Sequence, residues 1–181
     1  MSLSLSAPAA QAAADETTAA EAGAVAAAGT TPAKVRHDTP SRLPVPRFAA
    51  LKAPKTFCRI GPSFEHPVRV TFLRKGLPVI IVAETRDHWR KIQDRDGDTC
   101  WTHKSKLSGV DTGLIAAGGA TLLARPTEAA PVTAELGPGV IVAIEKSRGP
   151  WRRVVVGRMR GWTKAEHVWG AGAAEAAVRR D

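Results

Sequence analysis

The sequence lacks tyrosine altogether and has only two cysteines and four phenylalanines among its 181 residues. No hydrophobic run approaches the roughly 20 apolar residues that a transmembrane helix needs, so no transmembrane segment is predicted. Neither glycine-rich phosphate-binding pattern occurs, and the cysteines and histidines form no C-x-x-C or H-x-x-x-H pair of the kind that binds zinc. We therefore predict no cofactor, no metal site and no catalytic residues.

Positive charge is in excess, because 26 Lys and Arg residues stand against 17 Asp and Glu and give a net charge of +9. Residues 47–109 hold 13 basic and 6 acidic residues, a difference of +7, whereas residues 110–170 hold 8 and 5, a difference of +3. Such basicity favours an anionic partner. Nucleic acid, anionic lipid, acidic polymers and acidic proteins all fit this description.

The first 46 residues differ in composition from the rest, since Ala, Ser, Thr and Pro dominate and no Lys or Arg precedes Lys34. They bury too little apolar surface to offset their ordering entropy, so residues 1–46 are predicted to be a disordered tail. The opening resembles the end of a secretory signal peptide, with Ala10 and Ala12 suited to cleavage, but the basic and long apolar regions of a signal are missing. Either the true start lies upstream or the tail is a linker. Residues 171–181 are predicted to be a flexible C-terminal tail.

One pattern of proline, glycine and tryptophan occurs twice, once in residues 47–109 and once in residues 110–170. The marker residues are Pro62, Gly76, Trp89 and Trp101 in the first copy and Pro126, Gly139, Trp151 and Trp162 in the second. Their intervals are 14, 13 and 12 residues in the first copy and 13, 12 and 11 in the second. Each interval shortens by one residue, as single deletions in surface turns would produce. The sequence therefore predicts one structural unit written twice.

Short strands are predicted throughout both copies. Apolar residues alternate with other residues in one segment of each copy, as is typical of half-buried strands. These residues are Val68, Val70 and Phe72 in the first copy and Val132, Ala134 and Leu136 in the second. Continuous apolar runs at 79–82 and 140–143 indicate the most deeply buried strands, and pairs such as Asp96-Gly97 mark the turns. The pattern predicts an all-β fold, either a barrel or a sandwich.

Four motifs of the first copy occur in an order that resembles the bacterial SH3-like domain. They are T-F-C-R-I-G-P-S at 56–63, K-G-L-P-V at 75–79, H-W-R-K-I at 88–92 and D-G-D-T-C-W-T-H at 96–103. The second copy has diverged forms, which are L-A-R-P at 123–126, G-P-W-R-R-V at 149–154 and R-G-W-T at 160–163. The resemblance implies two tandem small SH3-like β-barrels. One departure is Cys100, which stands where the family usually has glycine.

The resemblance also implies a function. Domains of this family usually occur in exported bacterial proteins and are often ascribed to cell-wall or peptide binding rather than catalysis. We therefore expect a non-catalytic binding or targeting module of the cell envelope, periplasmic or secreted, that recognises cell-wall peptides or peptidoglycan. A cytoplasmic location, a nucleic-acid-binding role and a purely structural protein-interaction role stay open as alternatives.

Tryptophans in a small barrel either fill the core or form an aromatic groove for an extended ligand. Core packing is expected for Trp101, Trp151 and Trp162. Trp89 lies three residues before Ile92, and this odd spacing puts the two side chains on opposite faces of a strand. If Ile92 belongs to the core, Trp89 is expected at the surface.

A ligand-binding groove is predicted on the first barrel, because this copy carries most of the net charge. Trp89 would form its aromatic wall, and Arg59, Arg90 and Lys91 would supply its positive charge. The same combination of a tryptophan with basic neighbours suits the stacking of single-stranded nucleic-acid bases, so the nucleic-acid alternative is kept.

Cys58 and Cys100 both lie in the first copy. In an exported protein, oxidising conditions favour a disulfide between them, which requires Cα atoms within about 7 Å. The alternative is that Cys58 is an inert core residue. The cysteines with His88 and His103 are the only candidate metal ligands, and Cys58 with His103 is a conceivable nucleophilic pair, but neither has the supporting pattern such sites need.

Overall fold

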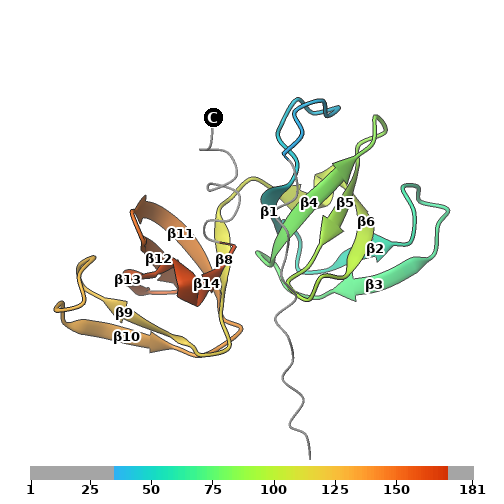
Figure 1. Ribbon diagram of the computed structural model, residues 1–181. Helices are drawn as coiled ribbons and strands as arrows, with labels where there is room; N and C mark the ends of the chain where they lie inside the picture. The colour runs from blue at the N-terminus through green and yellow to red at the C-terminus, as the bar shows by residue number, and fades with distance from the viewer. Residues whose placement is uncertain (1–34, 171–181) are drawn as a thin grey trace, which may run out of the picture. The chain divides into compact units, whose positions relative to one another are not determined.

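The computed structural model of the protein describes residues 35–170. Within this range the chain forms two antiparallel β-sheets in tandem, and its helical segments are short 3-10 turns (Figure 1). The prediction of an all-β fold with two tandem small barrels is therefore confirmed. No helix in the described part of the chain is long and apolar enough to span a membrane. The tails predicted for residues 1–34 and 171–181 lie outside the described residues.

The first barrel is a seven-stranded sheet with one 3-10 turn before its last strand. Its elements are β1 (Arg47–Leu51), β2 (Thr56–Arg59), β3 (Val68–Phe72), β4 (Pro78–Glu84), β5 (Trp89–Gln93), β6 (Thr99–His103), η1 (Lys104–Lys106) and β7 (Leu107–Ser108). The strand order is β3-β2-β6-β5-β4-β1-β7, so the turn-linked strands β4, β5 and β6 form the centre of the sheet.

The second barrel repeats this arrangement. Its elements are β8 (Thr112–Ile115), β9 (Ala120–Leu123), β10 (Val132–Leu136), β11 (Ile141–Arg148), β12 (Trp151–Val156), β13 (Met159–Lys164), η2 (Ala165–His167) and β14 (Val168–Trp169). The order β10-β9-β13-β12-β11-β8-β14 is that of the first barrel, strand for strand. The sequence repeat is therefore a repeat of topology.

The pairing registers of the two barrels also correspond. The matching pairs are Arg59–Trp101 with Leu123–Trp162, and Trp89–His103 with Trp151–Lys164. The residues missing from the second copy fall in the turns that follow β10, β11 and β12, which are shorter than those after β3, β4 and β5. The prediction of single deletions in surface turns is confirmed, and outside these turns the positions of the two barrels correspond.

Each barrel has its own core of small and medium apolar side chains. The first core consists of Val45, Ala49, Leu51, Cys58, Val79, Ile81, Ile92 and Cys100. The second consists of Ile115, Ala120, Leu122, Leu136, Val142, Val154 and Val168. The apolar runs at 79–82 and 140–143 each supply a side chain that is almost fully buried, Val79 in one barrel and Val142 in the other.

The alternation seen in the third strand of each copy predicts half-buried strands, and this prediction is only partly right. Phe72 packs against the first core and Leu136 belongs to the second, whereas Val68, Val70 and Val132 are exposed. The reason is that β3 and β10 are the edge strands of their sheets and extend past the core at one end. Alternation alone cannot show where along a strand the core stops.

Cys58 of β2 and Cys100 of β6 form a disulfide with their Cα atoms 5.6 Å apart, within the distance that the prediction requires. The second barrel has Leu122 and Gly161 at these positions. A Cβ atom placed on Gly161 would lie 2.7 Å from the Cβ of Leu122, so only glycine leaves room for the leucine. A leucine packed over a glycine therefore fills the space that the disulfide fills in the first barrel.

The Cys58→Ala/Cys100→Ala variant should lower the unfolding free energy of the first barrel by roughly 2 to 4 kcal/mol, because the chain between the two residues is no longer constrained when unfolded. The Cys58→Leu/Cys100→Gly variant, which copies the second barrel, should recover part of that loss. Denaturant unfolding of both variants and the wild type under non-reducing conditions measures the difference. Equal losses in the two variants would show that the Leu–Gly contact does not replace the disulfide.

Residues 35–46 belong to the first barrel, which corrects the prediction of a disordered tail extending to residue 46. The backbone of Arg36 exchanges two hydrogen bonds with that of Val45, and Val45 is only 2% exposed within the core. The prediction failed because one well-buried valine and a few polar contacts fix this segment. The overall composition of a segment does not reveal a single residue that the core buries, such as Val45.

Ser41, in the segment before β1, contacts a buried ion-pair network around Glu84. The side chain of Glu84 is inaccessible to solvent. Arg47 and Arg90 both contact Oε1 of Glu84, the Nε atom of Arg90 at 3.1 Å. The backbone amide of Ser41 donates a hydrogen bond to Oε2 at 3.0 Å. Burial raises the pKa of Glu84, but the hydrogen bonds from Ser41 and Arg47 and the charge of Arg47 outweigh this effect, so the pKa lies below its usual value.

Glu84→Gln should lower the unfolding free energy by about 3 to 5 kcal/mol at neutral pH, because it leaves two arginines facing an uncharged group in a buried site. Glu145→Gln is a matched control, since Glu145 also pairs with two arginines, Arg153 and Arg160, but at the surface. It should cost less than about 1 kcal/mol.

The contribution of Glu84 to the unfolding free energy should also depend on pH. Because the folded-state pKa is lowered, the contribution is fully present above the unfolded-state pKa of about 4.3 and is lost as the pH falls through the folded-state value. The stability difference between wild type and Glu84→Gln should therefore shrink in acid. Denaturant titrations at neutral pH and at about pH 3 measure it, and a difference that stays constant contradicts the lowered pKa.

Candidate functional site

The groove predicted on the first barrel is not open, because Trp89 is covered and Arg90 lies on the other face of its strand. Trp89 and Ile92 point to opposite faces of β5, as their spacing predicts, but Trp89 is only 5% exposed. The ring of Phe64 lies edge-on against Trp89 with the ring centroids 4.9 Å apart, and the His103 ring lies 5.9 Å away. The prediction that Trp89 is at the surface is therefore wrong. The spacing predicted correctly which face of β5 carries Trp89, but a loop covers that face.

The covering loop joins β2 to β3 and is held in place by polar contacts. Arg59 donates a hydrogen bond to the carbonyl of His66 at 2.5 Å, and its guanidinium carbon lies 5.9 Å from the centre of the Phe64 ring. Phe64 itself is 69% exposed. Burial lowers the pKa of His103 beneath the loop, and nearby positive charges, His88 first among them, lower it further. Trp89 is thus enclosed by an aromatic cluster and cannot offer a ring face to a ligand.

Arg90 is the second residue that the structure removes from the predicted groove. It lies on the opposite face of β5 from Trp89 and is buried against Glu84. Its guanidinium also donates a hydrogen bond to the carbonyl of Trp89 at 3.1 Å. Burial lowers the pKa of Arg90, and the charge of Glu84 acts in the opposite direction. Its role is internal, because it neutralises a buried carboxylate.

Arg59 and Lys91 do lie together, but around Trp101 rather than Trp89. In the sheet both are cross-strand partners of Trp101, Arg59 on β2 and Lys91 on β5. Trp101 is half-buried on the outer face of β6, because its neighbours Cys100 and Thr102 occupy the inner positions. Trp162 has the same half-buried position on β13. The expectation that these two tryptophans fill the cores is corrected by this alternation.

Alanine variants of the two tryptophans should therefore differ in stability. Trp89→Ala should cost about 3 to 5 kcal/mol, as the truncation of a buried aromatic residue does. Trp101→Ala should cost clearly less, because part of its ring already faces solvent. Denaturant unfolding monitored by circular dichroism measures both, and a larger cost for Trp101→Ala would contradict the burial described here.

The second barrel leaves the counterpart of Trp89 uncovered. Its β9–β10 loop, residues 124–131, has the same length as residues 60–67 and closes with the same backbone hydrogen bond, from Ala124 to Pro131. Glu128 stands at the position of Phe64, so no aromatic ring from residues 35–170 covers Trp151. Trp151 is half-buried, and it lines a hollow of about 260 Å³. The expectation that Trp151 is only a core residue is corrected.

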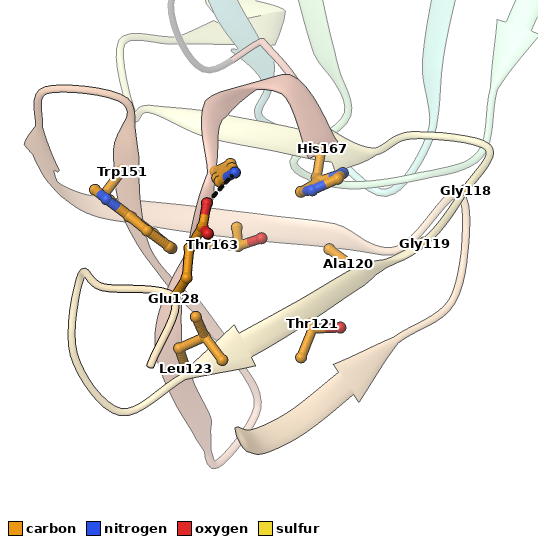
Figure 2. Close-up of a pocket in the computed structure, with 10 residues that line it drawn as sticks. Gly118, Gly119, Ala120, Thr121, Leu123, Glu128, Trp151, Thr163 and His167 are labelled. Atoms are coloured by element: carbon orange, nitrogen blue, oxygen red, sulfur yellow. Dashed lines mark ion pairs between the residues drawn. The ribbon is translucent and has the colours of Figure 1, made fainter. Parts of the chain in front are cut away.

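The hollow, called the acid–base hollow below, is drawn in Figure 2. It is lined by Gly118, Gly119, Ala120, Thr121, Leu123, Glu128, Trp151, Thr163, Lys164 and His167. In this view Trp151 and His167 lie on either side of Glu128. The glycines and alanine at its base keep it open, since the turn between β8 and β9 brings no large side chain into it.

Opposite charges meet within the acid–base hollow. The Nζ atom of Lys164 lies 2.6 Å from Oε1 of Glu128. The hydrogen bond and the charge of Lys164 lower the pKa of Glu128, and the same contact raises the pKa of Lys164, so both groups are charged at neutral pH. Thr163 is buried at the wall, and its Oγ1 has no hydrogen-bond partner among the described residues. The site offers an aromatic surface, a carboxylate and an ammonium group.

Sequence reasoning missed this hollow for an identifiable reason. Net charge and the expected exposure of Trp89 directed attention to the first barrel. The signal that distinguishes the barrels is the alignment of two loops of equal length, in which Phe64 of the first copy corresponds to Glu128 of the second.

The cysteine alternatives are also resolved by the structure. Both sulfur atoms are in the disulfide, so neither is a free thiolate for a metal or for nucleophilic attack. Among residues 35–170, no group of three or more His, Cys, Asp or Glu side chains is arranged to hold a metal ion.

Comparison with known proteins identifies the family. A model of the bacterial SH3 domain matches the chain twice, at residues 52–109 and 116–170, which is one match for each barrel. The chain therefore belongs to the bacterial SH3 domain family, as a tandem pair. No curated protein matches the chain.

Solved structures with some similarity include NlpC2 and NlpC1 from Trichomonas vaginalis and an NlpC/P60 family protein from Bacillus cereus. The match to NlpC2 has 12% identity and a TM-score of 0.31, and covers 68% of this chain and 47% of that one. The match to NlpC1 has 12% identity and a TM-score of 0.31, and covers 68% of this chain and 45% of that one. The match to the Bacillus protein has 13% identity and a TM-score of 0.32, and covers 67% of this chain and 55% of that one. The chain thus spans about half the length of these proteins.

Proposed function

We propose that the protein is a non-catalytic binding module of the bacterial cell envelope that recognises cell-wall peptides through the acid–base hollow of the second barrel. The observation that carries the proposal is the half-buried Trp151 beside the Glu128–Lys164 pair, at the position that Phe64 closes in the first barrel. Two barrels of one fold thus differ at the place where a ligand would bind.

The chemistry of the hollow suits a peptide. Its volume of about 260 Å³ falls below the roughly 300 to 1,000 Å³ of typical small-molecule sites, so it fits one or two groups of a longer chain. Trp151 supplies an apolar ring surface, and Glu128 and Lys164 supply one charge of each sign. Peptides carry amines, carboxylates and apolar side chains close together, which is the combination that this wall complements.

An envelope location is supported by the disulfide. Disulfides form and persist in oxidising compartments such as the periplasm and the exterior of the cell, and the described part of the chain has no free cysteine. The family membership points the same way, since the resemblance implies exported proteins. A binding role is favoured over catalysis because the two charged side chains of the hollow, Glu128 and Lys164, pair with each other rather than with a nucleophile.

A second candidate function, binding of single-stranded nucleic acid, is favoured by the first barrel. There Trp101 lies between the basic residues Arg59 and Lys91 on the outer face of the sheet. A partly exposed ring flanked by positive charges is the arrangement that stacks bases and contacts phosphates. This face and the acid–base hollow lie on different barrels, so separate variants test them.

Trp151→Ala should weaken binding to a soluble cell-wall stem peptide by more than about tenfold, as the removal of a central aromatic contact does. Phe57→Ala is the control, because it removes an exposed aromatic ring of the other barrel that lines neither hollow and should leave affinity unchanged. Calorimetry with the stem peptide and co-sedimentation with purified peptidoglycan measure binding, and circular dichroism checks folding.

Unchanged affinity in folded Trp151→Ala would overturn the proposed site. A wild-type protein that binds single-stranded DNA but no cell-wall fragment, and loses that binding in Trp101→Ala, would favour the second candidate instead.

A further inference from the structure

Trp151 also borders a second hollow, called the arginine hollow below, of about 570 Å³. It is lined by Arg125, Pro126, Thr127, Arg148, Gly149, Pro150 and Trp151. Trp151 is therefore the shared wall of two hollows on one barrel. Among the described residues, the lining of the second hollow contains two arginines and no acidic residue.

Neither arginine is neutralised within the described part of the chain. Residues 35–170 contain no ion pair or side-chain hydrogen bond of the Arg125 or Arg148 guanidinium, and both side chains are exposed. Nearby acids are already engaged, since Glu145 pairs with Arg153 and Arg160, and Glu128 pairs with Lys164. The hollow thus presents two positive charges, each of which offers a planar set of N–H donors.

The backbone fixes both arginines relative to Trp151. Arg148 is the cross-strand partner of Trp151, joined to it by the tight Gly149-Pro150 turn. Arg125 lies in the β9–β10 loop, which is held by hydrogen bonds from Thr127 to Arg125 and from Ala130 to Thr127. Pro126 and Pro150 have restricted backbone angles. Little backbone entropy remains to be lost when a ligand binds, and the ordering cost is confined to the two arginine side chains.

The first barrel cannot form this hollow. Gly61 stands at the position of Arg125, and Thr85, which pairs with Trp89 through its backbone, stands at that of Arg148. The ring of His66 occupies the space that a side chain at position 61 would need, since a Cβ atom on Gly61 would lie 2.3 Å from it. Both arginines are therefore specific to the barrel that leaves its tryptophan uncovered.

We infer that the arginine hollow binds a carboxylate group of the peptide whose neighbouring residue occupies the acid–base hollow, so that Trp151 separates two adjacent subsites. The inference rests on the proposed function and adds a ligand class, namely acidic peptides with a free carboxylate. Guanidinium groups hydrogen bond to carboxylates with charge assistance, and neutral amides gain much less from the same donors. An amidated peptide should therefore be discriminated against at this subsite.

The test compares a cell-wall stem peptide whose carboxylates are free with the same peptide fully amidated. Wild-type protein should bind the free acid at least about tenfold more tightly, as charge-assisted hydrogen bonds predict. The Arg125→Gln/Arg148→Gln variant should bind both forms with nearly equal affinity. Arg86→Gln/Arg158→Gln removes the same two charges from exposed turns and should keep the tenfold preference. Calorimetry at one fixed salt concentration gives all six affinities.

The outcomes separate this inference from the proposed function. If wild type binds acid and amide equally, the carboxylate subsite is wrong and the peptide site stands. If the control variant loses the preference as fully as Arg125→Gln/Arg148→Gln does, the effect is bulk charge and the subsite is again wrong.

If neither stem peptide binds, the proposed function fails, and hexaglutamate with hexaglutamine as its neutral partner then tests the subsite alone. Hexaglutamate binding that is lost only in Arg125→Gln/Arg148→Gln supports the subsite. Binding that is absent, or that both double variants reduce equally, overturns it.

Discussion

Both barrels depend on the contact between their second and sixth strands. In each sheet a single residue pair joins these strands in register, Arg59 with Trp101 or Leu123 with Trp162, whereas the fifth and sixth strands share at least five pairs. The side chains just inside this narrow seam must therefore hold the barrel together. The first barrel uses a covalent bond between Cys58 and Cys100, and the second uses a leucine packed on a glycine. These are two solutions to one packing problem.

The seam also determines whether the tryptophan of the fifth strand is exposed, because the loop that follows the second strand passes over that tryptophan. With the strand ends fixed and the loop length constant, the residue at the middle of the loop decides whether the tryptophan is covered. Phe64 adds an aromatic ring to a cluster with Trp89 and His103. Glu128 instead forms an ion pair with Lys164 and leaves Trp151 partly exposed. A single position thus separates a closed face from a receptive one, and the more basic barrel is the closed one.

The repeat, the all-β fold and the places of the deletions could be predicted from the sequence, because strand patterns and turn residues are local signals. The surroundings of individual side chains could not. The spacing of Trp89 and Ile92 gave the correct faces of β5, but whether a face is open depends on a loop more than twenty residues earlier. Arg90 looked like a surface charge because its buried partner Glu84 lies on another strand. Likewise, Val45 is an anchor only because the core has a place for it.

The first strand has a practical consequence for where the folded unit is taken to begin. The family match starts at residue 52, yet β1 ends at Leu51 and lies in the sheet between β4 and β7. A fragment cut at the family boundary would lose that strand, the Val45 anchor and the Ser41 amide that binds Glu84. It would expose the edge of β4 and leave the Glu84 carboxylate with Arg90 alone, and an exposed strand edge invites pairing with other chains. Expression of the first barrel by itself therefore requires the residues from about 35 onward, although they fall outside the recognisable domain.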